Sequence, residues 1–548
     1  MRVLFVYPNL YTQMGFNHGL ASLSAVLKAA GHETELVNLN ERLPPVPTRE
    51  DIYRRIREWD AGLIGFSCLS MQYSEALATA RELRELAERD GFRLPPMVVG
   101  GIHPSMVPQE VMADRVWDFV GVGECEEPLL ELVRRIEAGE STDDVANFLC
   151  WPGGERSSTG EWRTNAVGEF PDVRELPVAD YALFDTQRIV DQKNGWFGIL
   201  TSRGCPYRCT YCLNHKIVDR YRADLGRSTS GIGFLRYRRP ESVIEELREV
   251  LEHYDGVGTF ILDDDLFTMN SEHAIAFANA YHDSGLGVPW VVNSHVERLE
   301  PRVASALKRG GCRILKLGIE AGAERVRKEV LKRFMNDDDI LSTIATAESV
   351  GLHTSGFVMV GLPGESLDER WATVDLLARS GIGRFRTSIF YPFPGTESHQ
   401  ASIDGGYVSK AAAGSLTDFT STSALDFGPE ENLLVAKFAA VMPWLVNARL
   451  DGPTAERYRP HAEAVLAMDR AEWDAFAPSV RELDAELSRA AVEAGELHYA
   501  IRYNAFMGVR SDYFLAEEAG LEWTTAAAKP VPDDLARRAL AAAAGQSC

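Results

Sequence analysis

Three cysteines stand close together near the middle of the chain, and their type and spacing suit metal binding. The segment Gly204–Cys212 reads Gly-Cys-Pro-Tyr-Arg-Cys-Thr-Tyr-Cys, so Cys205, Cys209 and Cys212 occupy positions i, i+4 and i+7. The same spacing describes one face of a helix, where cysteine packs well. The glycine before the first cysteine and the proline after it disfavour such a helix. We therefore interpret the three thiols as metal ligands.

The number of thiols favours an iron–sulfur cluster over a structural zinc ion. Zinc usually takes four protein ligands, often from paired Cys-x-x-Cys units, and the sequence has no second pair. Three thiolates can bind three irons of a [4Fe–4S] cluster and leave the fourth iron open. We expect such a cluster on Cys205, Cys209 and Cys212, with a further ligand on the open iron.

The cysteine segment follows a predicted strand in the second of two α/β regions. Amphipathic helical stretches separate the strand candidates of this region. Six such units predict a partial (β/α)6 barrel, with its chemistry at the carboxyl ends of the strands. The candidates are Phe197–Ser202, Gly258–Leu262, Trp290–Asn293, Arg313–Ile319, Gly356–Gly361 and Phe385–Tyr391.

The first region also alternates short apolar runs with amphipathic stretches. This pattern is typical of a parallel sheet with helices on both faces. We predict a flavodoxin-like, Rossmann-like domain whose ligand site lies beyond the carboxyl ends of its strands. Its five strand candidates are Val3–Tyr7, Glu35–Val37, Gly62–Ser67, Met97–Gly100 and Asp118–Val122.

The positions where this alternation of strands and helices changes predict the domain boundaries. The α/β fold class covers an N-terminal domain at 1–137 and the barrel at 196–400, with a connector at 138–195 between them. After the barrel we predict a helical C-terminal domain at 401–523, with helices around 430–450 and 460–493. An alanine-rich, proline-containing segment at 524–548 is predicted to be a flexible tail.

Charge and composition limit the partners. The 548 residues carry 57 Lys+Arg and 80 Asp+Glu, a net charge of −23, which disfavours nucleic acid and anionic membrane surfaces. No apolar run approaches the roughly 18 residues of a membrane span. The segment Met1–Pro8 leads directly into a predicted strand and shows no signal peptide. We expect a cytoplasmic protein with reduced cysteines and with neither nucleic acid nor membrane as a partner.

The cysteine segment and the six-strand pattern together resemble the radical S-adenosylmethionine (SAM) superfamily. In that family the open iron binds SAM, and an electron from the cluster cleaves SAM to methionine and a 5′-deoxyadenosyl radical. The segments Phe260–Phe267, Gly318–Gly322 and Gly356–Glu365 match further family motifs. By itself the aspartate run in the first of them would also suit a solvated loop or a magnesium site. The resemblance implies SAM binding by Asp264, Asp265, Ser294, Glu320 and Gly361.

The N-terminal region resembles the cobalamin-binding domain of B12-dependent radical SAM enzymes. The resemblance rests on glycine loops after the strands and on the segment Pro177–Phe184 before the barrel. Such loops are also common in other doubly wound folds. The domain lacks an Asp-x-His-x-x-Gly signature, so the family resemblance implies cobalamin with its own base displaced and no histidine on cobalt. The implied cobalamin-binding residues are Ser67, Gly100, Gly101, His103, Gly121, Gly123 and Glu124.

The resemblance to class B radical SAM methyltransferases also implies an activity. Such an enzyme moves a methyl group from SAM via methylcobalamin to an unactivated carbon, or a phosphinate, of a small-molecule substrate in biosynthesis. An electron donor such as flavodoxin or ferredoxin would reduce the cluster. The alternatives are a cyclase or rearrangement enzyme without net methyl transfer, and a non-catalytic cobalamin or cluster sensor.

Substrate contacts are the least determined part of the site. We single out Arg236 and Arg238, from an arginine-rich stretch, because guanidinium groups bind carboxylates and phosphates. A solvated charged loop is the other interpretation of this stretch. Tyr391, at the end of the sixth predicted strand, is either a substrate contact or a packing residue.

Overall fold

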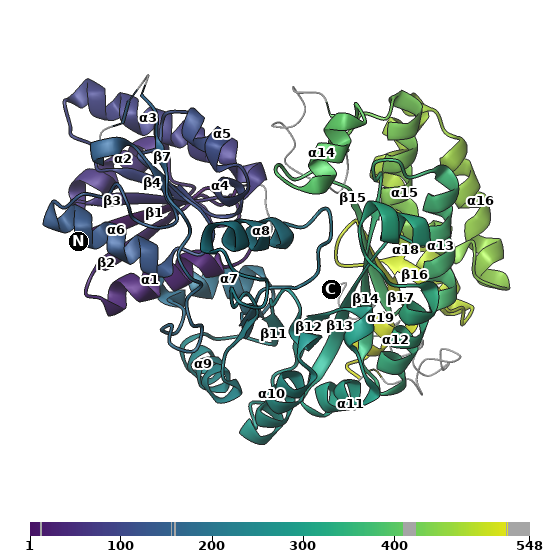
Figure 1. Cartoon of the computed structure of the whole chain (residues 1–548). Helices are drawn as coiled ribbons and strands as arrows, with labels where there is room; N and C mark the ends of the chain where they lie inside the picture. The colour runs from purple at the N-terminus through teal and green to yellow at the C-terminus, as the bar shows by residue number, and fades with distance from the viewer. Residues whose placement is uncertain (11–13, 155, 158–159, 409–422, 522, 524–548) are drawn as a thin grey trace. The chain divides into compact units, whose positions relative to one another are not determined.

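The structure is a computed structural model of the whole chain (Figure 1). It describes residues 1–10, 14–154, 156–157, 160–408, 423–521 and 523; the tail predicted at 524–548 lies outside them. Two compact units divide the chain. Unit 1 contains Met1–Asp265 and Phe393–Gln400, and unit 2 contains Leu266–Pro392 and the remaining described residues after Gln400.

The N-terminal part of unit 1 is a parallel sheet in the predicted flavodoxin-like order β2-β1-β3-β4-β5. Alternate residues of the first strand enter different cores: Leu4 and Val6 pack on one face, and Val3 and Phe5 on the other. This double burial explains the continuous apolar sequence of the strand. The strands are β1 (Arg2–Tyr7), β2 (Glu33–Asn38), β3 (Leu63–Ser67), β4 (Met97–Gly100) and β5 (Phe119–Gly121).

Helices cover both faces of this sheet. In Figure 1, α1 packs beside α6, and α2 packs beside α3. The helices are α1 (His18–Ala29), α2 (Arg49–Glu58), α3 (Tyr73–Asp90), α4 (Ile102–Met106), α5 (Pro108–Ala113) and α6 (Glu126–Ala138).

Two short strands extend the sheet beyond β5. β6 (Phe148–Cys150) pairs antiparallel with β5, and β7 (Arg163–Thr164) pairs antiparallel with β6. The sequence places these residues in the connector, where it allows a small hairpin around Gly153–Gly160 without fixing its strands. Strands of three and two residues are too short to show an alternating pattern.

Unit 1 also contains the first two of the six predicted barrel strands. β8 (Trp196–Ile199) pairs parallel with β11 (Thr259–Leu262), and β9 (Ser202–Arg203) pairs antiparallel with β10 (Arg236–Tyr237). The helices of this part are α7 (Thr186–Gln192), α8 (Asn214–Leu225) and α9 (Pro240–His253).

Unit 2 contains the other four predicted barrel strands. They are parallel neighbours in chain order: β12 (Trp290–Ser294), β13 (Cys312–Glu320), β14 (His353–Val360) and β15 (Arg384–Ile389). Their helices are α10 (Ser271–Ser284), α11 (Pro301–Arg309), α12 (Asp337–Ser349) and α13 (Leu367–Ser380), and α14 (Glu397–Asp404) follows β15. All six strands predicted for the barrel are therefore confirmed.

The C-terminal part is mainly helical. Its helices are α15 (Pro429–Asn447), α16 (Pro453–Ala467), α17 (Arg470–Phe476), α18 (Val480–Glu493) and α19 (Ser511–Glu518). The stretch predicted as helical at 460–493 spans three of them, because Asp469 starts a new helix with a capping box. In the described part of the chain, no helix is long and apolar enough to cross a membrane.

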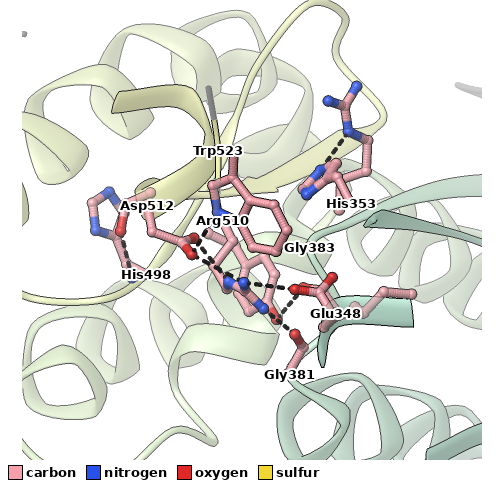
Figure 2. A network of polar contacts seen from close by, with 12 residues as sticks. Glu348, His353, Gly381, Gly383, His498, Arg510, Asp512 and Trp523 are labelled. Atoms are coloured by element: carbon pink, nitrogen blue, oxygen red, sulfur yellow. Dashed lines mark hydrogen bonds and ion pairs between the residues drawn. The ribbon is translucent and has the colours of Figure 1, made fainter. Parts of the chain in front are cut away.

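The C-terminal part also contains two strands that the sequence analysis does not predict. β17 (Met507–Arg510) pairs antiparallel with β15, and β16 (Tyr499–Ile501) pairs with β17. A buried polar network holds this addition in unit 2 (Figure 2). Arg510 donates to Asp512 at 2.8 and 3.0 Å and to Glu348 at 3.1 Å, while the Trp523 indole N–H also reaches Asp512 at 3.1 Å.

Candidate functional site

The three cysteines lie on one loop of unit 1, between β9 and α8. Cys209 is buried, Cys205 and Cys212 are partly buried, and none of the three is in a disulfide bond with another described residue. Gly204 begins the loop at φ +95°, and a Cβ there would lie 2.3 Å from the carbonyl oxygen of Phe234. Only glycine allows this close approach.

The cysteine loop carries the donor set of an iron–sulfur cluster. Burial raises the pKa of Cys205 to about 12, and Asp265, Cys212 and Cys209 add to this effect, so the three thiols lie near one another. In the described residues no three His, Cys, Asp or Glu side chains converge as they would around one metal ion. Cluster ligands need no such convergence, because each cysteine binds a different iron. A bound metal would supply the positive charge that stabilises the deprotonated thiolate form of these buried cysteines.

The two predicted SAM aspartates after β11 have different surroundings. Asp264 is fully buried. Its carboxylate accepts hydrogen bonds from the N–H and hydroxyl of Thr201 at 2.6 and 2.5 Å and from those of Ser202 at 3.1 and 2.7 Å. Asp265 is exposed and lines a cavity beside Gly204 and Asn214. Asp264 thus fixes the turn before the cysteine loop, whereas Asp265 is accessible from the cavity.

That cavity, of about 530 Å³, lies within unit 1. The carboxyl edge of the N-terminal sheet contributes six of the predicted cobalamin residues: Ser67, Gly100, Gly101, Gly121, Gly123 and Glu124. The segments around β9 and β11 contribute Ser202, Arg203, Gly204, Asp263 and Asp265. The structure therefore brings the glycine loops and the start of the cysteine loop to one cavity.

The glycines of this cavity are required in different ways. A Cβ on Gly101, at φ +97°, would lie 2.8 Å from the backbone of Cys68, and a Cβ on Gly123, at φ +74°, would lie 2.4 Å from the Tyr221 hydroxyl. The fold itself requires these two. A Cβ on Gly100 would meet nothing within 4 Å. This open space is the room that a large ligand lying against the sheet edge needs.

His103 is not among the described residues that line the cavity. Its Nδ1 lies 3.1 Å from the Ser70 hydroxyl, and its ring lies 4.4 Å from that of Tyr73. Burial lowers the pKa of His103 to about 4, so the ring is neutral at physiological pH.

Both arginines predicted for the substrate are bound to carboxylates. Arg236 donates to Glu124 at 2.9 Å and to the Pro171 carbonyl at 3.0 Å. Arg238 pairs with the buried Glu246 and donates to the Leu200 carbonyl at 3.0 Å. Burial alone would raise the pKa of Glu124, but Arg236 and Arg203 hold it below its ordinary value. The charges of Arg236 and Arg238 are thus compensated within unit 1.

The remaining predicted SAM residues follow strands of unit 2. Ser294 ends β12 and shares a 2.7 Å hydrogen bond with Thr268. Glu320 ends β13 at φ +69°, a strained backbone conformation for a residue other than glycine. Gly361 follows β14 at φ +75°, and its N–H donates to the buried Glu365 at 2.9 Å. Tyr391 follows β15 and is buried. All four lie at the carboxyl ends of their strands, where a barrel places its chemistry.

The sequence analysis missed two features of the cavity in unit 1. Arg203 bridges Glu124 and Glu126 at 2.6 and 2.7 Å. The His18 Nε2 atom lies 3.2 Å from Asp263, and both residues line the cavity. The position of Arg203 two residues before Cys205 is the one sequence signal that could have identified it.

Two family models match the chain. The model of the radical SAM superfamily matches residues 199–377, and that of the B12 binding domain matches residues 11–133. The cysteine loop falls within the first match, and all six cavity-lining residues predicted for cobalamin fall within the second.

Several known proteins are similar to this chain over most of its length. The uncharacterized methyltransferase PH0819 of Pyrococcus horikoshii is 26% identical over 389 residues, covering 70% of this chain and 78% of that protein. The anaerobic magnesium-protoporphyrin IX monomethyl ester cyclase of Cereibacter sphaeroides is 24% identical over 420 residues, covering 74% and 64%. The structure of the cobalamin-dependent radical enzyme OxsB, with aqua-cobalamin and SAM bound, has a TM-score of 0.63 at 13% identity and covers 88% of this chain and 75% of its own.

These comparisons agree with the site. The likeness to OxsB shows the fold, and the two family matches give the cofactors: a [4Fe–4S] cluster, SAM and cobalamin. The chain thus combines a radical SAM domain with a B12 binding domain, as expected for a cobalamin-dependent radical SAM enzyme.

Proposed function

We propose that the chain is a methyltransferase that moves a methyl group from SAM to an unactivated carbon, or a phosphinate phosphorus, of a small-molecule substrate in biosynthesis. The cavity of unit 1 carries this proposal. It is lined both by the glycine loops of the B12-binding domain and by the start of the cysteine loop. A shared cavity holds reacting groups close together, which lowers the entropic part of the barrier.

Cys205, Cys209 and Cys212 would hold the cluster, which when reduced supplies the electron that cleaves SAM. Asp265, Ser294, Glu320 and Gly361 would bind SAM. Asp264 would act on SAM indirectly, since its carboxylate is occupied by Thr201 and Ser202. A protein donor such as flavodoxin or ferredoxin would reduce the cluster in the cytoplasm.

Cobalamin, when bound, would carry the methyl group between SAM and the substrate. Ser67, Gly100, Gly101, Gly121, Gly123 and Glu124 would hold it in the cavity. His103, neutral and hydrogen-bonded to Ser70, would support the adjacent loop. Its place off the cavity lining favours cobalamin without a histidine on cobalt. Tyr391 remains our candidate for a substrate contact.

We propose the domain limits of the sequence analysis for these roles: cobalamin binding at 1–137, the connector at 138–195, SAM cleavage at 196–400 and a covering helical domain at 401–523. The helices of that last part and the four strands of unit 2 belong to one compact unit, which supports a close association of the two.

The first experiment is anaerobic reconstitution with iron, sulfide and hydroxocobalamin, followed by metal counting and a visible spectrum. We expect about four irons and one cobalt per chain, with a base-off spectrum. Irons without cobalt would rule out the methyl carrier. Candidate substrates are then incubated with methyl-labelled SAM, and transfer of the label to a product identifies the methyltransferase.

The cyclase similarity supports a second candidate, a cyclisation without net methyl transfer. Such an enzyme would form 5′-deoxyadenosine from SAM but leave the methyl label in methionine. A cobalamin or cluster sensor would form no 5′-deoxyadenosine at all. The same labelled incubation therefore separates the three functions.

A further inference from the structure

Arg386 lies within β15, on the face of the strand opposite to the one that α15 covers. Successive side chains of a strand point to opposite faces. Phe385 and Ile389 are buried on the side of α15, where the Phe385 ring lies near Pro443 of that helix. Arg386 and Ser388 are only partly buried. Because the helices of a barrel lie outside its sheet, Arg386 belongs to the inner face of the sheet in unit 2.

The charge of Arg386 has no counter-charge in the described part of the chain. Burial lowers the pKa of Arg386 from its ordinary value, and no neighbouring carboxylate opposes this effect. Its guanidinium carbon lies 4.4 Å from the ring centre of Phe506. Arg384, two residues earlier on the same face, donates to the His353 ring at 2.9 Å and adds a second positive charge. A guanidinium stays protonated at physiological pH, so Arg386 carries an uncompensated positive charge.

Two other buried arginines of unit 2 show the usual arrangement. Arg370 pairs with Glu431, and Arg510 pairs with Asp512 at 2.8 Å. Burying a charge is costly unless it is paired. At Arg386 the fold therefore keeps a cation whose partner the chain does not provide, which is typical of a residue that binds an anionic ligand.

Two observations favour the substrate over SAM as the source of the anion. The proposed SAM residues of unit 2 follow β12, β13 and β14, whereas Arg386 is on β15, the strand that leads to Tyr391. Arg386 and Phe506 also lie outside residues 199–377, which match the radical SAM family model. SAM binding is common to that family. A residue outside the match therefore suits a ligand that differs between its members.

We propose that Arg386 binds a carboxylate or phosphate group of the substrate. The inference rests on the proposed function, because it requires a small-molecule substrate at the barrel. A guanidinium can donate two parallel N–H bonds to such a group, and the ligand would supply the missing counter-charge. Arg386 would thus have the role for which the sequence analysis singles out Arg236 and Arg238, both of which are already paired with carboxylates.

The test is calorimetric titration of the reconstituted full chain with inorganic phosphate and with acetate, at constant ionic strength and without a reductant. We expect the unchanged protein to bind one of the two anions, and Arg386→Met to bind it about tenfold more weakly or less, because a hydrogen-bonded charge pair is lost. Arg386→Lys keeps the charge but not the paired donors, so its affinity should fall between the two. The anion bound more tightly identifies the substrate group. Binding of neither anion, or equal binding in Arg386→Met, would overturn the proposal.

Repeating the titrations with saturating SAM separates the two sources of the anion. A substrate group should bind beside SAM, so phosphate or acetate should bind equally well when SAM is present. Arg386→Met should also keep its SAM affinity. Competition between SAM and the anion would assign Arg386 to the SAM carboxylate and overturn the substrate role. The competition experiment needs only the unchanged protein, so it tests the assignment even where a variant does not fold.

Arg449→Met is the matched control. Arg449 also lies over an aromatic ring of unit 2, 4.7 Å from the centre of Trp371, but it pairs with Asp375 at 3.2 Å. Its charge is thus compensated, and this variant should bind the anion like the unchanged protein. Loss of binding in both variants would assign the effect to general destabilisation and overturn the proposal.

The inference and the proposed function fail in different ways. If the protein binds cobalt and transfers the methyl label, but anion binding does not depend on Arg386, the assignment of Arg386 is wrong and the proposed function stands. If the protein binds no cobalt, the methyl carrier is excluded and the proposed function itself fails, whatever the anion titrations show.

Discussion

Asp264 and Asp265 are adjacent in the sequence, yet their carboxylates have different surroundings. The family motif identifies the pair but does not separate the two roles. The separation depends on Thr201 and Ser202, which lie more than sixty residues earlier and occupy the oxygens of Asp264. Such long-range hydrogen bonds have no local pattern in the sequence.

We predict that Asp264→Asn destabilises unit 1 and lowers the iron content after reconstitution. The amide has one acceptor oxygen, so at least one buried donor of Thr201 or Ser202 would lose its partner, at a cost of about 1–3 kcal/mol. Thermal unfolding and iron counting check this. Asp265→Asn is the control: we expect normal unfolding and iron content, with weaker SAM binding. An Asp264→Asn protein as stable as the unchanged one would contradict the positioning role.

We also predict that Cys205→Ala, Cys209→Ala or Cys212→Ala abolishes SAM cleavage and spares cobalamin binding. The three thiols are on the loop after β9, whereas the proposed cobalamin residues follow β3, β4 and β5. The measurements are 5′-deoxyadenosine formation and cobalt per chain. Loss of cobalt in any single variant would show that the cavity needs an intact cysteine loop.

Glu365 should make unit 2 less stable as the pH rises. Burial raises the pKa of Glu365 from its ordinary value near 4.5 to about 7, and its Oε1 has no hydrogen-bond partner among the described residues. Because the folded protein holds this proton more tightly than the unfolded chain, the stabilising contribution is full below about pH 4.5 and lost by about pH 7. The shift corresponds to about 3 kcal/mol. Glu365→Gln should flatten this part of the stability profile measured by urea unfolding between pH 5 and 8; an unchanged slope would contradict the assignment.

Other site residues show how much pattern alone can predict. Ser67 and the glycines after the sheet strands line one cavity, as their common position at the carboxyl ends of parallel strands leads one to expect. The sequence alone does not show that an ion pair compensates the charge of Arg236. Its partner Glu124 is 112 residues away.

At the scale of elements, long strands are predicted well and short ones are not. The strands of both parallel sheets are predicted from apolar runs bounded by glycine and polar residues, because burial on both faces makes such runs continuous. β6, β7, β16 and β17 have two to four residues each and pair antiparallel. Tertiary pairing, rather than local sequence, determines these strands.

The stability of the segment that contains β17 and α19 depends strongly on the side chain of Arg510. We predict that Arg510→Met lowers the free energy of unfolding by about 3–5 kcal/mol, because Asp512 and Glu348 would remain buried without their cation. Denaturant unfolding measures this loss. Arg502→Met is the control from the same segment: its pair with Glu518 is 38% and 34% exposed, so we expect a change of at most about 1 kcal/mol. Similar losses in both variants would argue against a special role of the buried network.

At the scale of the whole molecule, compact units and family domains divide the chain differently. The radical SAM match begins at residue 199 and ends at 377, while the compact units divide at Asp265. The first two strands of the predicted barrel, β8 and β11, therefore share a unit with the B12-binding domain. Sequence patterns follow the repeated strand–helix units and carry no information on this division, which depends on the density of long-range contacts.

The antiparallel pairing of β17 with β15 also affects the tendency of the protein to aggregate. Without β16 and β17, the unpaired backbone groups of Arg384–Ile389 would form an open sheet edge, and such edges promote strand pairing between molecules. We predict that a chain ending at Gly495 self-associates, as measured by light scattering after size-exclusion chromatography. A chain ending at Trp523, which keeps both strands and the Asp512 contact, should elute like the full-length protein. If the shorter chain has the same oligomeric state as the full-length protein, the β15 edge does not cause aggregation. If it self-associates, β16 and β17 prevent aggregation by covering that edge.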